Sequence, residues 1–186
     1  MIHKFELTTD DVYRQRLKDA IDQVIPDDMN TSEQTNLHFV DDWKMLQIKI
    51  KETVLSYLSL QPTDYHLYLP PENADIWIMK SWGIKTSPKQ MLIYGNHNHA
   101  YAHLAFCYYL DVPDKGGNTF FQDGFMESQH PVKSNDIMLW PGHIEHRIPT
   151  NLGDKPRYTI AGDLMLFDKT DTNVHWGSPV DKWIKL

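Results

Sequence analysis

The spacing of the apolar residues changes near position 75, and this change constrains the fold more than any other feature of the sequence. Before it, apolar residues recur every three or four positions, as on one face of a helix. After it, short apolar or alternating segments are separated by turn sequences, as in β-rich proteins. The sequence therefore predicts a mainly β fold, with helices confined to the first part of the chain.

Two amphipathic helices are predicted within about residues 1–60. The first has a candidate capping box, with Thr8 as the N-cap and Asp11 three residues later, and it ends before Pro26. The second covers residues 43–60, where apolar residues recur at steps of three and four. We expect both helices to cover one face of a sheet.

Short strands are predicted over about residues 75–168, separated by turn sequences rich in Gly, Pro, Asn and Asp. The strand segments are 76–82, 91–94, 104–110, 119–121, 137–140, 147–149 and 158–167. Many short strands with polar turns indicate a double-stranded β-helix, the cupin-like jelly roll. The predicted architecture is this jelly roll with the N-terminal helices packed on one sheet.

A chain of 186 residues is best interpreted as a single domain, 1–186. Within it we expect a helical part at about 1–60, a jelly-roll core at about 75–168 and a C-terminal tail at 169–186. The aromatic residues Trp176 and Trp183 predict that the tail is ordered.

The bulk composition excludes several classes of function. The formal charge of −7 argues against nucleic acid or an anionic membrane surface as a partner. A single cysteine, Cys107, excludes an intrachain disulfide and a cysteine-based zinc site. Neither a signal peptide nor an apolar stretch of about 20 residues is found. These features predict a cytoplasmic, intracellular protein and leave a homodimer open.

Three histidines form the first candidate site. His97 and His99 are two positions apart, so on extended backbone their side chains point to the same face. His146 follows 47 residues after His99, where the next extended segment begins. Three imidazoles on one side of an iron(II) ion would leave its other positions open. His143 competes for the third place, but the turn after Trp140 puts it in a loop and favours His146.

An arginine, Arg157, follows eleven residues after His146. A guanidinium forms two parallel hydrogen bonds with a carboxylate and stays charged, so it could hold the carboxylate of a co-substrate. The alternative is a surface arginine paired with Asp154 or Asp163. The upstream histidines favour the first interpretation.

The sequence resembles the 2-oxoglutarate- and Fe(II)-dependent oxygenases, and most of all the small bacterial and phage oxygenases that are similar to prolyl hydroxylases. The resemblance rests on short stretches in the family's order: 97–99, 106–110, 116–120, 140–146 and 157–159. It implies that His97 and His146 bind Fe(II). It also implies that Arg157, Thr159 and Tyr109 bind the far carboxylate of 2-oxoglutarate.

The sequence departs from the family at position 99, where the pattern has a carboxylate ligand and this chain has His99. A neutral imidazole in that place leaves the metal centre more positive by one unit. Asp123, just beyond the predicted strand 119–121, is the alternative source of a carboxylate. We rank His99 ahead of Asp123.

The resemblance implies a dioxygenase that uses Fe(II), 2-oxoglutarate and dioxygen (O2). Such a hydroxylase couples oxidation of a C–H bond in a small-molecule or peptidyl substrate to decarboxylation of 2-oxoglutarate to succinate. Two alternatives stay open. One is a three-histidine dioxygenase of the cupin type that needs no 2-oxoglutarate. The other is a non-catalytic jelly-roll module that binds a ligand or a protein.

Overall fold

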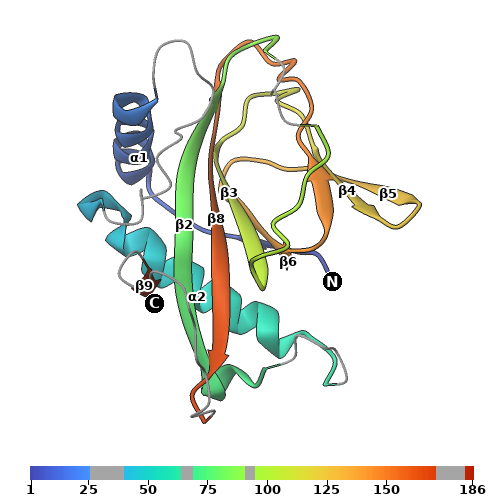
Figure 1. The fold of residues 1–186 in the computed structure, drawn as a ribbon. Helices are drawn as coiled ribbons and strands as arrows, with labels where there is room; N and C mark the ends of the chain where they lie inside the picture. Colours follow the sequence, from blue (N-terminus) through green and yellow to red (C-terminus); the bar gives the residue numbers. More distant parts are fainter. Residues whose placement is uncertain (26–39, 64–68, 91–94, 171–182) are drawn as a thin grey trace.

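The described residues form two antiparallel sheets and two α-helices, and both helices lie on the same side of the larger sheet (Figure 1). The structure is a computed structural model that describes residues 1–25, 40–63, 69–90, 95–170 and 183–186. The predicted mainly β fold is confirmed. None of the helices in these ranges combines the length and apolar character of a membrane span.

The first helix, α1 (Asp11–Val24), begins later than predicted. Its N-cap is Asp10, whose side chain accepts a hydrogen bond of 2.7 Å from the backbone amide of Tyr13. The prediction of Thr8 as the cap was wrong, because the aspartate two residues later performs that role. The second predicted helix is confirmed as α2 (Lys44–Ser59). The part of the chain that the structure describes also contains two short 3-10 helices, η2 (Asp41–Trp43) and η3 (Pro71–Asn73).

The larger sheet has the strand order β1-β6-β3-β8-β2-β9, with every neighbouring pair antiparallel. Its strands are β1 (His3–Glu6), β6 (Asp136–Pro141), β3 (Leu104–Asp111), β8 (Arg157–Asp168), β2 (Ala74–Thr86) and β9 (Ile184–Lys185). The longest of these, β2 and β8, pair along their whole length and form the centre of the molecule.

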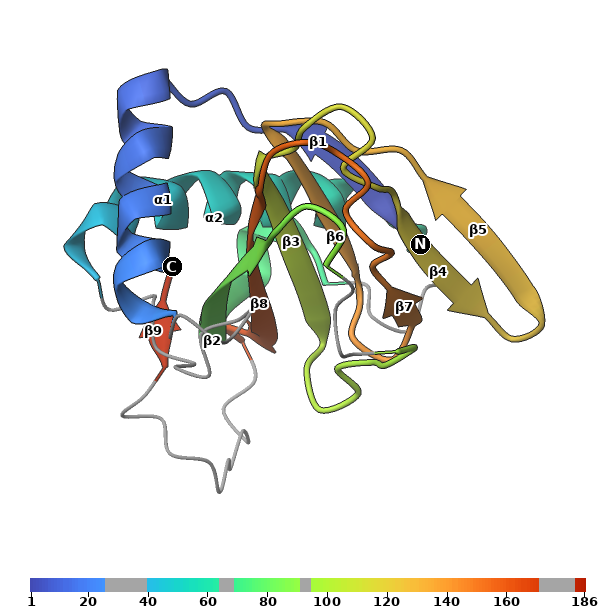
Figure 2. The same ribbon diagram turned by 90° about the horizontal axis from the view of Figure 1, so that it is seen from above.

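The smaller sheet has the order β5-β4-β7. Its strands are β4 (Thr119–Asp123), β5 (Met126–His130) and β7 (Glu145–Arg147). The hairpin β4–β5 extends away from the side of the molecule that carries the helices (Figure 2). Its tip presents Phe125 and Met126 to solvent.

Most predicted strands coincide with observed ones. The prediction of a strand at 147–149 was wrong. The observed strand β7 pairs with β4 from Gln122 to Phe120, and this pairing stops at Arg147. The strands β1 and β5 were not predicted, since both are short edge strands with few apolar residues. The predicted strand 91–94 and most of the C-terminal tail, residues 171–182, lie outside the described residues.

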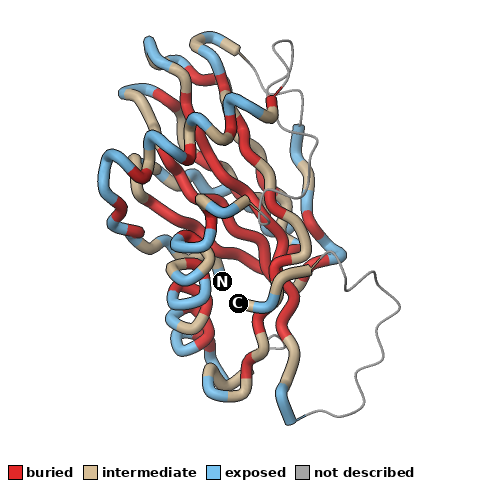
Figure 3. Tube along the Cα trace, turned by 90° about the vertical axis from the view of Figure 1, so that its left-hand side faces the viewer, coloured by how far each residue is buried: buried red, intermediate tan, exposed pale blue. Residues whose placement is uncertain are grey.

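Alternate residues of β3 pack into two different cores. Phe106 and Tyr108 belong to the core under the helices, whereas Cys107 and Tyr109 belong to the core shared with Phe121 of the smaller sheet. Because both faces of this sheet are covered, buried residues are continuous along its central strands (Figure 3).

The same alternation applies to β8, whose even-numbered residues Ile160 and Leu164 face the helices. The odd-numbered residues therefore face the space between the sheets, as do their partners on β3. The pairs across the two strands are Ala105 with Asp163, Cys107 with Ala161, and Tyr109 with Thr159. This interior face carries most of the candidate site.

Candidate metal centre

The segment that carries His97 and His99 is held to β7 and to the turn that precedes it by backbone hydrogen bonds. The amide of His97 donates to the carbonyl of His146 at 3.1 Å, and the reverse bond is 2.8 Å long. The amide of His99 donates to the carbonyl of Gly142 at 2.7 Å. Two segments that are distant in sequence are therefore fixed side by side.

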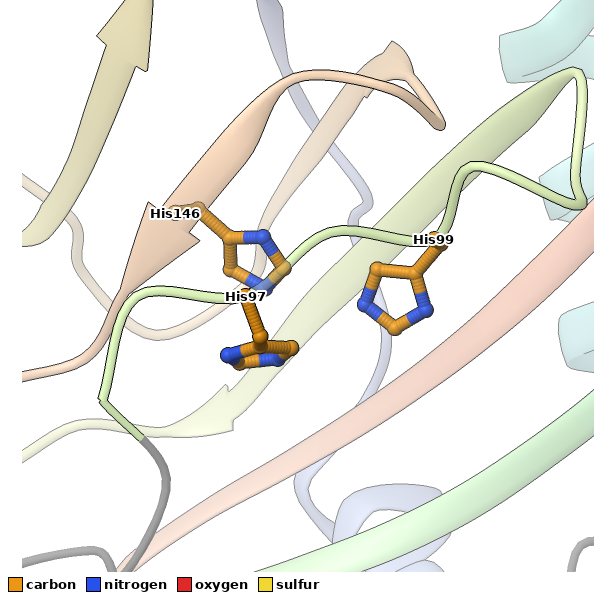
Figure 4. Close-up of side chains that lie close together, drawn as sticks. All are labelled: His97, His99 and His146. Carbon is orange, nitrogen blue, oxygen red and sulfur yellow. The ribbon is translucent and has the colours of Figure 1, made fainter.

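The three imidazoles converge on one point (Figure 4). One possible ligand atom from each ring lies within 4.8 Å of those of the other two rings. The ring centroids of His97 and His146 are 4.3 Å apart, and that of His99 is 5.4 Å from His97 and 5.2 Å from His146. Imidazole is a common ligand of divalent iron, zinc and copper, so this cluster could hold a transition metal.

Aromatic side chains surround the cluster. Trp82 stacks on His99 with ring centroids 5.7 Å apart, and the ring of Trp140 lies 4.9 Å from that of His146. Burial, followed by repulsion from the neighbouring histidines, lowers the pKa of His146 to about 3. Burial also lowers the pKa of His97. Both rings are therefore neutral at pH 7 and offer lone pairs to a metal.

The ring of His97 is oriented by its own loop. Its Nδ1 lies 3.0 Å from the carbonyl oxygen of Gly95. Because a carbonyl can only accept, this contact requires a proton on Nδ1 and leaves the lone pair of the neutral ring on Nε2. A histidine ligand whose second nitrogen donates to a carbonyl is the usual arrangement in metal sites.

A buried carboxylate lies behind His99. Oδ1 of Asp163 is 2.8 Å from Nδ1 of His99, and Oδ2 accepts a hydrogen bond of 2.7 Å from the hydroxyl of Tyr101. Asp163 is fully buried and Tyr101 is half exposed. The other ring nitrogen of His99 points toward the remaining two histidines (Figure 4).

Two residues considered as ligands lie elsewhere. His143 is exposed and takes no part in the cluster. Asp123 is exposed at the end of β4, where it pairs with Met126 of the hairpin rather than with β7. Among the described residues, no aspartate or glutamate joins the three histidines as a member of the cluster.

Arg157, at the start of β8, is 1% exposed. Its Nη1 donates to the carbonyl of Gly116 at 2.6 Å, and its Nη2 makes longer contacts of 3.5 Å with the hydroxyl of Thr86 and the carbonyl of Pro149. No carboxylate in the described ranges forms an ion pair with it, so the alternative of a paired surface arginine was wrong. Burial lowers the pKa of Arg157, and Tyr109 and Cys107 oppose this shift.

Tyr109 and Thr159 lie beside this arginine on the interior face. Both are buried, and the hydroxyl of Tyr109 contacts that of Thr119. Burial raises the pKa of Tyr109, and Arg157 opposes this rise, which places the guanidinium within electrostatic reach of the phenol. Burial likewise raises the pKa of Cys107 to about 11, against hydrogen bonds with Tyr109 and Thr159. The structure thus groups the three predicted co-substrate residues together.

Two features of the site were missed from the sequence. Asp163 was considered only as an ion-pair partner of Arg157. Its side chain lies on the same face of β8 as those of Arg157 and Thr159, because the three positions are separated by even numbers of residues. Gly117 was named only within the stretch 116–120, without a role of its own. The φ of Gly117 is +96°, a conformation that favours glycine, and a Cβ added there would lie 3.1 Å from Nη1 of Arg157. A glycine therefore fits beside the guanidinium better than a residue with a side chain.

No family model and no curated protein matches the sequence. Solved structures do match the fold. An alpha-ketoglutarate-dependent epimerase, SnoN from nogalamycin biosynthesis, has a TM-score of 0.67 at 12% identity, with 96% of this chain and 87% of that chain covered. The chain has the jelly-roll fold of the 2-oxoglutarate and Fe(II) oxygenases. The predicted fold class is thereby confirmed.

Two further structures extend the likeness. The carbocyclase SnoK, from the same biosynthesis, has a TM-score of 0.65 at 12% identity and covers 92% of this chain and 83% of that chain. A prolyl-4-hydroxylase from Pseudomonas putida has a TM-score of 0.57 at 11% identity, with coverages of 88% and 91%. At these identities the likeness establishes the oxygenase fold, and the activity has to be argued from the site itself.

Proposed function

We propose that the protein is a 2-oxoglutarate- and Fe(II)-dependent dioxygenase that hydroxylates its substrate. One observation carries the proposal. Three imidazoles converge at one end of an interior strand face, and the other end holds a buried arginine that has no carboxylate partner among the described residues. A metal centre that binds a dicarboxylate co-substrate could use both features, the imidazoles for the metal and the guanidinium for the far carboxylate.

His97, His99 and His146 would hold the iron. Three neutral nitrogen donors suit Fe(II) and leave coordination positions for a co-substrate and for dioxygen. When bound, iron with 2-oxoglutarate and dioxygen supplies oxidation of a C–H bond coupled to decarboxylation to succinate. The residues of this chain hold the reactants and keep water away.

Arg157 would bind the far carboxylate of 2-oxoglutarate. A buried guanidinium without an anion is costly, and a carboxylate removes that cost through two parallel hydrogen bonds. The hydroxyls of Tyr109 and Thr159 lie on the same face and would donate to the remaining lone pairs.

The interior face between the two ends carries small side chains. Ala161 and Cys107 lie opposite each other on β8 and β3, between Asp163 at the metal end and Thr159 at the arginine end. Their side chains are small, so they form a low floor over which the co-substrate would extend. The apolar wall of Ile84 and Trp82 on β2 would exclude water there.

We further propose a small-molecule or peptidyl substrate that approaches the metal from the side of Tyr101. This residue is 54% exposed and lies next to His99, with ring centroids 6.3 Å apart. The similar structures include proteins named for nogalamycin biosynthesis and a prolyl-4-hydroxylase, so the fold accommodates both classes of substrate.

The test is an anaerobic titration of the Fe(II)-loaded protein with 2-oxoglutarate. We expect a weak visible metal-to-ligand charge-transfer band that needs both additions, and succinate formation once oxygen is admitted. The His97→Ala variant should give neither signal. A wild-type protein that binds Fe(II) but develops no band and forms no succinate would contradict the proposal.

A second candidate is a three-histidine dioxygenase that does not use 2-oxoglutarate. His99, in the place of a carboxylate ligand, favours it. The buried Arg157 favours the first candidate, since a dicarboxylate co-substrate would supply the anion that this interior cation lacks among the described residues. Oxygen consumption with substrate but without 2-oxoglutarate would identify the second candidate.

A further inference from the structure

We propose that Asp163 is a positioning residue of the metal centre. It orients His99 and supplies, from behind the imidazole, the negative charge that a carboxylate at position 99 would supply directly. The inference rests on the metal centre of the proposed function, but it does not depend on 2-oxoglutarate or on the substrate.

The geometry places the carboxylate against the ring nitrogen that faces away from the other histidines. Oδ1 of Asp163 lies 2.8 Å from Nδ1 of His99, while Tyr101 donates to the other oxygen, Oδ2. Neither Nδ1 nor Oδ1 has an aligned hydrogen bond despite this short distance. We infer that a small rotation of the ring would complete the contact when Nε2 holds a metal.

Burial gives the second argument. Asp163 is fully buried, and among the described residues no lysine or arginine forms an ion pair with it. Lys80 stands opposite Asp163 on β2, but its ammonium lies 4.6 Å from the ring centre of Tyr101 and not within ion-pair distance of the carboxylate. A buried charge needs a compensating partner. A divalent cation bound through His99 provides one.

The charge balance gives the third argument. Two imidazoles and one carboxylate contribute one negative charge to a metal, whereas His97, His99 and His146 contribute none. A carboxylate that accepts from the second nitrogen of a histidine ligand fixes its tautomer and makes it a stronger donor. Asp163 thus restores the missing charge one side chain further from the metal.

The experiment measures Co(II) affinity of the full-length protein in the absence of 2-oxoglutarate, by titration of the visible d–d absorption. For Asp163→Asn, which keeps the shape and removes the charge, we expect about 10- to 100-fold weaker binding. The control is Asp123→Asn, the same change at an exposed position outside the cluster; its affinity should equal that of the wild type.

A second measurement separates this role from a structural one. With the metal removed by a chelator, Asp163→Asn should unfold at the same or a higher temperature than the wild type, because it removes an uncompensated buried charge. A residue needed only for folding would lower that temperature. The combination of weaker metal binding and undiminished metal-free stability is the signature of the proposed role.

A double-mutant cycle with His99→Asp tests the charge argument. In that background a carboxylate binds the metal directly and lies against Asp163, so the two negative charges repel. We expect Asp163→Asn to strengthen Co(II) binding there, although it weakens binding in the wild-type background. A loss of the same size in both backgrounds would overturn the proposal.

The remaining outcomes are decisive as well. If wild type and Asp163→Asn bind Co(II) equally, Asp163 has no positioning role and the proposed function stands. If Asp163→Asn loses more affinity than His99→Ala, Asp163 is itself a ligand and the proposal is wrong. If the wild type binds no metal, the proposed function fails with it.

Discussion

The carbonyl oxygen of Gly142 accepts a hydrogen bond of 2.7 Å from the amide of His99. The two backbones are so close that a Cβ added to Gly142 would lie 2.4 Å from the carbonyl oxygen of His99 and 2.2 Å from that of Ala102. The absence of a side chain at position 142 is therefore what allows the histidine segment to dock on the end of β6.

Gly142→Ala should displace the segment that carries His97 and His99. Because backbone atoms cannot yield as a flexible side chain does, we expect a loss of stability of about 1–3 kcal/mol and at least tenfold weaker Co(II) binding. Urea unfolding and Co(II) titration measure the two effects. Gly95→Ala is the matched control, since a Cβ there meets nothing within 4 Å. Equal Co(II) affinities for the two variants would contradict this explanation.

Arg157→Lys should weaken 2-oxoglutarate binding without changing metal binding. The lysine keeps the charge but loses the second parallel hydrogen bond, so about tenfold lower affinity, or roughly 1.4 kcal/mol, is expected. Calorimetric titration of the Co(II)-loaded protein with 2-oxoglutarate gives the value. Arg147→Lys is the control, because Arg147 is partly exposed and paired with Glu127. An unchanged affinity in Arg157→Lys would remove the arginine from the co-substrate site.

Ala161→Leu should obstruct the floor between the metal and Arg157. The added bulk projects into the space where the co-substrate would lie, so 2-oxoglutarate binding should become undetectable while Co(II) binding stays within a few-fold of wild type. Ala161→Ser, which adds one small atom, should retain most of the 2-oxoglutarate affinity. Retention of tight 2-oxoglutarate binding by the leucine variant would place the co-substrate elsewhere.

The metal-free protein should lose stability as the pH falls from about 6.5 toward 3. The pKa of His146 is lowered from 6.5 to about 3 in the fold, so the unfolded chain binds the proton first. At about 1.4 kcal/mol per pH unit, this histidine contributes at most about 5 kcal/mol. Urea unfolding in a chelator at several pH values measures the slope. His146→Asn should flatten it, and an unchanged slope would show that the ring titrates normally.

Much of this site could be predicted because its signals are local or periodic. His97 and His99 are two positions apart, so extended backbone predicts that they face the same side. The resemblance implied Thr159, and its place two residues after Arg157 on β8 agrees with that assignment. The switch in hydrophobic spacing near position 75 likewise predicted helices first and strands after.

The rest could not be predicted because it depends on strand register. Nothing near Asp163 in the sequence shows that it faces His99, since the contact depends on how the 97–103 segment docks against β8. The helix cap at Asp10 was missed, because threonine and aspartate are both favoured N-cap residues and the sequence alone does not rank them. The edge strand β5 has almost no apolar residues and exists through its pairing with β4.

The strand β8 carries four residues of the candidate site at every second position: Arg157, Thr159, Ala161 and Asp163. Inserting or deleting one residue between the first and last of these would turn one end of the set toward the helices. The site can therefore diversify by exchanging side chains but not by changing the length of this strand. Natural variants and engineered libraries should place their insertions in the surrounding loops and leave this stretch at constant length.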